Sequence, residues 1–182
     1  MKKILPKILL ASVFVLTLFL GFRFANIGID AVIQFDPGIP ASRLEADIRK
    51  EQKIPDTWTV EGNVSDTMAA FISYSQDKAA HTASVYVDRP GVSSGYFFRF
   101  GGPASTASRD ITAFTVNGYN EAAFVSMNTK QVFQVEIGDG NNIRVINIDP
   151  DKPFAIILPL DAGSICFYNS DGKIIDYRQQ AI

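Results

Sequence analysis

The sequence predicts an all-β protein, a mostly antiparallel β-sandwich or partly open barrel, with one short helix and a transmembrane helix before it. Segments rich in β-branched and aromatic residues alternate with Gly, Asp, Asn and Pro about every ten residues from residue 57 onward, which is typical of sandwiches and barrels. A helix-capping pattern precedes them, and an apolar run begins the chain. We therefore expect an anchor (residues 1–25), a connector with a short helix (residues 26–56) and an extracytoplasmic β domain (residues 57–182).

The apolar run predicts a membrane anchor. Between residues 8 and 22 the only polar side chains are those of Ser12 and Thr17. Residues 4–24 together approach the roughly 20 residues that a helix needs to cross a bilayer. Three lysines precede the run and Arg23 follows it, so the positive-inside rule places the N-terminus in the cytoplasm and the β domain outside.

A cleaved secretory signal is the alternative to this anchor. Cleavage requires small residues one and three positions before the cut. Cleavage after Ala25 would need a small residue where Arg23 stands, and cleavage after Gly21 would need one where Phe19 stands. We therefore favour an uncleaved, single-pass signal-anchor over a protein that is secreted after cleavage.

The composition excludes several classes of function. With a single His and a single Cys, the 182 residues cannot form a Cys/His zinc cluster, a CxxC redox motif or an internal disulfide. From residue 26 onward, 13 basic residues stand against 19 acidic ones, a net charge of −6. Such a surface disfavours nucleic acid and anionic lipid as partners.

The connector is expected to contain a helix of about ten residues. Ser42 and Glu45 have the spacing of a capping box. Leu44 and Ile48 are four residues apart and share one face, and the helix should end before Pro55. We expect this helix to pack on the edge of a sheet; the alternative is a docking helix for a membrane partner.

The β domain should contain about 9–11 short strands. Alternation is clearest at Ala83, Val85 and Val87, which predicts one buried and one solvated face. The segment 154–160 is apolar on both sides and is expected to be a central strand. Residues 138–141 and 169–172 are expected to form tight turns. The expected strands are 58–61, 69–74, 82–88, 95–100, 111–116, 121–127, 131–137, 143–148, 154–160, 164–168 and 173–177.

The most unusual segment is a run of aromatic residues at 96–100. On a regular strand, Tyr96, Phe98 and Phe100 point one way, and Arg99 the other. One face must be core, and the other can present a ring beside a guanidinium, as in platforms that bind sugars or proteins. The alternative is that both faces are buried, with Arg99 paired to an acid. The candidate ligand-binding residues are Tyr96, Phe98, Arg99, Phe100 and Trp58.

No set of residues predicts catalysis, a metal or a cofactor. His81 and Cys166 lack an activating context, and no GxSxG motif, phosphate loop or dinucleotide fingerprint is present. The acidic turns do not have the spacing of an EF-hand. We therefore expect no catalytic residues, no metal ligands and no cofactor.

Three functions remain open at this point. The first is an interaction module that binds an envelope or membrane protein, which predicts an exposed apolar patch. The second is a carbohydrate- or small-ligand-binding module, which predicts at least two coplanar exposed aromatic rings. The third is an enzyme, for which no constellation is visible. We favour the first and keep the second as the alternative.

Overall fold

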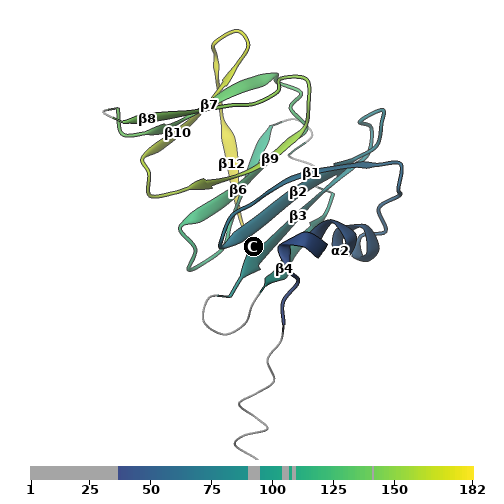
Figure 1. The fold of residues 1–182 in the computed structure, drawn as a ribbon. Coiled ribbons are helices and arrows are strands. Elements are labelled where there is room, and N and C mark those ends of the chain that lie inside the picture. The colour runs from purple at the N-terminus through teal and green to yellow at the C-terminus, as the bar shows by residue number, and fades with distance from the viewer. Residues whose placement is uncertain (1–36, 90–94, 104–106, 108–109, 141) are drawn as a thin grey trace, which may run out of the picture. The chain divides into compact units, whose positions relative to one another are not determined.

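The computed structural model describes residues 37–89, 95–103, 107, 110–140 and 142–182. The predicted anchor lies outside these residues. Within them, no helix combines the length and the apolarity needed to cross a bilayer. The described chain forms three four-stranded sheets, mostly antiparallel, and one short α-helix (Figure 1). The predicted all-β class with one short helix is therefore confirmed.

Sheet A contains β1, β2, β3 and β4 in that order, and all neighbouring pairs are antiparallel. Sheet B has the order β12-β5-β6-β9, and its one parallel pair is β12 with β5. Sheet C has the order β11-β10-β7-β8 and is antiparallel throughout. The strands are β1 (Thr59–Val64), β2 (Met68–Tyr74), β3 (His81–Asp88), β4 (Tyr96–Gly102), β5 (Ile111–Thr115), β6 (Glu121–Ser126), β7 (Val132–Gly138), β8 (Ile143–Asn147), β9 (Phe154–Pro159), β10 (Ser164–Asn169), β11 (Ile174–Ile175) and β12 (Tyr177–Ala181).

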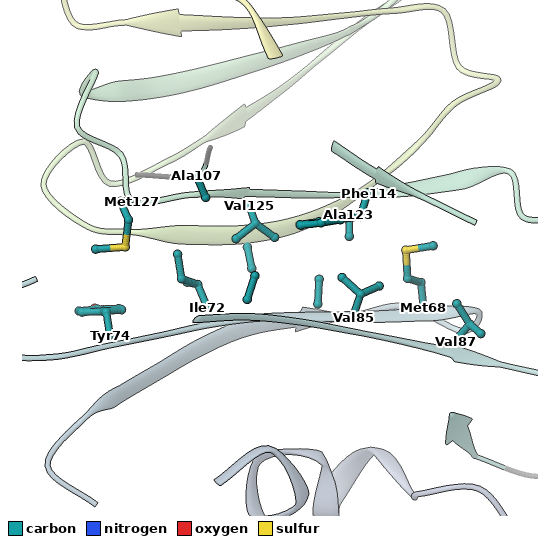
Figure 2. Packing of buried hydrophobic residues seen from close by; sticks show 13 residues of the cluster. Met68, Ile72, Tyr74, Val85, Val87, Ala107, Phe114, Ala123, Val125 and Met127 are labelled. Atoms are coloured by element: carbon teal, nitrogen blue, oxygen red, sulfur yellow. The ribbon is translucent and has the colours of Figure 1, made fainter. Parts of the chain in front are cut away.

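Sheets A and B pack face to face, as in a β-sandwich. Side chains from β2 and β3, among them Ile72 and Val85, meet side chains from sheet B, among them Phe114 and Val125 (Figure 2). All four are fully buried. Burial of aliphatic and aromatic side chains on this scale is the main favourable contribution to folding.

The opposite face of sheet B packs against sheet C. Phe124 of β6 and Phe167 of β10 lie with their ring centroids 5.3 Å apart, and both are fully buried. Sheet B is thus covered on both faces, which explains why β5 and β6 are buried at almost every position. The three sheets form successive layers in the order A, B, C.

The outer face of sheet A is covered by a helical segment, η1 (Ala41–Arg43) followed by α2 (Leu44–Glu51). Leu44 and Ile48 are fully buried and contact a cluster that includes Ala69 and Tyr86, so the shared helix face is confirmed. The helix lies on the face of sheet A rather than on its edge. The expected capping box is wrong: Arg43 is the N-cap and makes no side-chain capping bond, and Glu45 instead pairs with Arg49 at 2.8 Å.

Several strand expectations are confirmed and others are corrected. The turn at residues 169–172 is closed by the Gly172 amide, which donates to Asn169 O at 2.8 Å, and it joins β10 to β11. The second face of β3 is not solvated, because Tyr86 on that face is buried under α2. β9 is an edge strand of sheet B, not a central strand, and its two faces are buried by the neighbouring layers. The last expected strand corresponds to two, β11 and β12, which gives twelve strands in the described chain.

Candidate protein-interaction surface

The outer face of sheet C is the surface of the three stacked sheets that no other described element covers. Sheet A is covered by α2 on its outer side, and sheet B lies between A and C. The buried side of sheet C is formed by Val135, Ile137 and Phe167. Their strand neighbours in sequence point the other way, away from sheet B.

This outer face combines exposed aliphatic side chains with a polar centre. Val145 of β8 lies opposite Glu136 of β7, and Ile174 of β11 lies opposite Tyr168 of β10. Val145, Ile143 and Ile174 are 50%, 55% and 59% exposed. These are the three most exposed of the large hydrophobic side chains in the described chain, and all three lie on one sheet face.

Polar groups hold the centre of this face in place. Gln134 Nε2 donates to Glu136 Oε1 at 2.8 Å. Partial desolvation and the neighbouring Glu136 carboxylate raise the pKa of the Tyr168 phenol above its ordinary value. Cys166 lies opposite Glu136 and is half-buried on the same face, not in the core. We call the outward residues 134, 136, 143, 145, 166, 168 and 174 the sheet C face.

β8 also has a free backbone edge. It is the last strand of sheet C and pairs only with β7 among the described strands. The turn between β7 and β8 requires glycine at Gly138, since a Cβ there would lie 2.0 Å from Asn142 O. The expected hairpin at residues 138–141 is confirmed by this pairing, although Asn141 lies outside the described residues. A free edge strand with exposed aliphatic side chains is a characteristic docking element.

The aromatic run of β4 is divided between two faces. Val85 pairs with Phe100 but Tyr86 pairs with Phe98, so Arg99 is an extra residue in a β-bulge. Phe100 packs into the core between sheets A and B, with its ring centroid 4.6 Å from that of Phe114. The expectation that Tyr96, Phe98 and Phe100 share one face is therefore wrong.

The helix side of β4 carries Tyr96 and Phe98. Tyr96 packs in the α2 cluster, and its hydroxyl donates to Ser65 O. Phe98 is 49% exposed and meets Tyr86 edge to face at 5.5 Å. Among the four candidate aromatic residues, including Trp58, it is thus the only one in the exposed class, and the paired exposed rings expected of a platform do not form around it.

The remaining candidates lie apart from one another. Arg99 is exposed and makes no ion pair with a described residue. The guanidinium that does lie on an aromatic ring is that of Arg89, 4.2 Å from the centroid of Phe97. Trp58 packs half-buried against the α2 cluster, and its carbonyl accepts a bond from Arg49 at 3.2 Å.

The geometry separates the two residues considered for nucleophilic chemistry. His81 begins β3 in sheet A, whereas Cys166 lies on the outer face of sheet C. Sheet B lies between these two sheets. Among the described residues, no group of three or more His, Cys, Asp or Glu side chains is arranged to hold a metal ion.

A cavity of about 550 Å³ lies between the β1–β2 turn and the β5–β6 turn. Glu121 lines it, and the Oε2 atom of Glu121 accepts hydrogen bonds from the hydroxyls of Ser65 and Thr67. The other lining residues are Asn117, Gly118, Tyr119, Asn120, Pro159 and Asp161. Its carboxylate, amide and hydroxyl groups suit a ligand with hydroxyl or amino groups, and Tyr119 and Pro159 add apolar surface beside them. No sequence pattern indicates this site, because its residues come from three separate turns.

The sheet C face was not predicted from the sequence either. Val145 and Ile146 are adjacent apolar residues in a five-residue strand. Because neighbours in a strand point to opposite faces, this dipeptide could have indicated that both faces of β8 are apolar. Searches of protein-family models, curated proteins and solved structures found no match to this chain.

Proposed function

We propose that this protein is a membrane-anchored interaction module whose extracytoplasmic β domain binds an envelope or membrane protein through the sheet C face. The observation that carries the proposal is the gathering of Ile143, Val145 and Ile174 on one uncovered sheet face. Exposed apolar side chains on an uncovered face that also carries polar groups are typical of interaction sites.

The anchor and the location remain part of this proposal. The apolar run at residues 4–24 and its flanking charges support a single-pass topology with the N-terminus in the cytoplasm. The excess of acidic residues after residue 26 supports a protein partner over nucleic acid.

Site-specific photo-crosslinking of the full-length protein in its own membranes tests the proposal. A photoreactive amino acid at Ile174 should capture a defined envelope protein, and the same amino acid at Val64 should not. Val64 is a matched control because it is an exposed aliphatic residue of sheet A. Capture should also be lost in Val145→Asp and kept in Val64→Asp. Equal capture from both positions would contradict the proposal, and so would capture from Ile174 that is unchanged by Val145→Asp.

The second candidate function is binding of a carbohydrate or a small ligand in the cavity around Glu121. The Glu121 and Asp161 carboxylates make no ion pair with a described residue, so an amino-containing sugar would supply a complementary charge. An array of neutral and amino-containing oligosaccharides should detect binding that is lost in Glu121→Gln. Asp56→Asn is the control, because Asp56 is exposed and lies outside the cavity. Binding that persists in Glu121→Gln would rule out this site.

A further inference from the structure

We propose that the free edge of β8 binds β8 of a second copy of this chain, antiparallel, across a two-fold axis at Val145. The result is a continuous eight-stranded sheet whose outer face joins two sheet C faces. The inference rests on the proposed function, since it names a partner for the same surface.

The backbone groups of β8 that face the free edge belong to alternate residues. The Ile148 amide donates to Phe133 O at 2.8 Å, in register with the pairing of Asn147 and Gln134. Backbone groups in an antiparallel strand alternate between the two sides. Arg144 and Ile146 therefore bond toward β7. The N–H and C=O groups of Ile143, Val145 and Asn147 point to the free edge.

These three residues form a self-complementary ladder. With a two-fold axis at Val145, that residue faces its own copy, and Ile143 faces Asn147 of the second copy. All three residues with free backbone groups are then in hydrogen-bonded pairs, which gives about six hydrogen bonds. An axis shifted by one residue to Arg144 gives about four.

Charge selects the same register. An axis at Arg144 would place two guanidinium groups directly opposite each other, which is destabilising. An axis at Val145 places Arg144 beside Ile146 of the second copy. The aliphatic stem of the arginine can then cover the isoleucine side chain. The two Glu136 carboxylates are then separated by three strand spacings, about 14 Å, which exceeds the screening length of about 8 Å.

The other sheet edges of the described chain are protected. Ile39 forms a bridge with Tyr96 at the edge of β4, with two backbone bonds of 2.8 Å. The edge strands β1 and β9 lie against each other, and Asn63 of β1 accepts a bond from the Ile157 amide of β9 at 3.2 Å. β11 has two residues, and β12 presents Arg178, Gln179 and Gln180 to solvent. β8 is the edge that combines five residues with exposed aliphatic side chains.

Cysteine cross-linking of the full-length protein in its membranes tests the pairing. In a Cys166→Ser background, Val145→Cys should form a covalent dimer on oxidation, because paired residues lie about 5.5 Å apart. Ile143→Cys and Asn147→Cys, carried on differently tagged copies and expressed together, should form a mixed dimer. Each of these two alone should form little dimer. Val64→Cys is the exposed control.

A second measurement separates pairing from chance collision. Val145→Pro removes an N–H that points to the free edge and leaves the bonds to β7 in place. The detergent-solubilised protein should be a dimer by light scattering, and Val145→Pro should halve its mass. Val64→Lys should leave the mass unchanged.

The outcomes distinguish this inference from the proposed function. Failure of Val145→Cys to cross-link above Val64→Cys, with capture from Ile174 intact, overturns the second copy as partner and leaves the proposed function standing. A dimer from Ile143→Cys alone that matches the mixed dimer overturns the register. If no envelope protein is captured from Ile174 but the Val145→Cys dimer forms, the result contradicts the proposed function and supports the pairing of β8 with β8 of a second copy.

Discussion

Tyr86 of β3 donates its phenolic proton to Asp47 Oδ2 of α2 at 2.9 Å, and the tyrosine is fully buried. This bond joins the helix to the outer face of sheet A. Burial, and secondly the hydrogen bond to Asp47, raise the pKa of Tyr86 above its usual value. The folded state therefore holds the phenol in its protonated, donating form more strongly than water holds a free tyrosine.

Tyr86→Phe should lower the free energy of unfolding by about 1.5–2 kcal/mol, since hydrogen bonds to charged groups contribute about that much. Asp47→Asn keeps an acceptor oxygen and should cost less, about 0.5–1 kcal/mol. Urea unfolding followed by Trp58 fluorescence measures both, because Trp58 is the single tryptophan and packs beside α2. If Tyr86→Phe left the free energy of unfolding unchanged, this bond would not be what holds the helix on the sheet.

The helix and most strands could be predicted because their signals are local. The Leu44–Ile48 spacing marks the buried helix face, and the Asn169–Gly172 turn carries its own turn residues. The burial of Tyr86 could not be predicted in this way. Its strand alternates like a half-solvated one, and only the return of α2 over sheet A buries the second face.

The bulge in β4 predicts that replacing Phe100 or Phe98 by alanine lowers the free energy of unfolding by unequal amounts. Phe→Ala in a core costs about 3–5 kcal/mol. Phe100→Ala should cost about 2–3 kcal/mol, because Phe100 packs on Phe114 in the core but is only partly buried. Phe98→Ala should cost less than about 1 kcal/mol, because half of the ring is already in solvent. Equal costs in denaturant unfolding would mean that the two rings share a face and that no bulge is present.

The positions of the candidate site residues depend on features that a sequence pattern does not contain. A bulge is one extra residue at Arg99, and nothing in the run from 96 to 100 distinguishes a bulged strand from a regular one. The sheet C face depends likewise on the order of layers. The strands that contribute Val145 and Ile174 lie at opposite edges of that sheet and far apart in sequence.

The stability at alkaline pH should depend on Tyr74. Burial, and secondly the hydrogen bond that its hydroxyl donates to Glu61 at 3.0 Å, raise the pKa of Tyr74 from its ordinary 10 to about 12. The folded state thus keeps this proton where the unfolded state has lost it. The stabilisation is complete below pH 10 and is lost as the pH rises to about 12. Urea unfolding should therefore show a steeper loss of stability from pH 10 to 12 in the wild type than in Tyr74→Phe.

Glu61→Gln is the control for the cause of that shift. It removes the carboxylate charge but leaves Tyr74 buried, and burial is the larger cause. The variant should therefore flatten only part of the alkaline dependence. A wild-type slope that matches Tyr74→Phe would show that the Tyr74 phenol titrates normally in the folded state.

The turn between β6 and β7 depends on Asn128, which is 5% exposed and has φ at 53°. Its Oδ1 accepts from the Val132 amide at 2.7 Å, and its Nδ2 donates to Val132 O at 3.1 Å and to Asp149 O at 2.9 Å. Asn128→Ala leaves these buried groups unpaired and should cost about 2–4 kcal/mol. Asn128→Asp should also destabilise the fold, because a carboxylate would face two carbonyl oxygens.

Asn128→Gly separates the side-chain bonds from the backbone conformation. Glycine adopts a positive φ without strain, so this variant removes the three bonds and adds only the entropic cost of a more flexible unfolded chain. Most of the loss measured for Asn128→Ala should remain in it, with the difference of about 1 kcal/mol assigned to backbone strain. If Asn128→Gly were as stable as the wild type in denaturant unfolding, the turn would need only the backbone conformation.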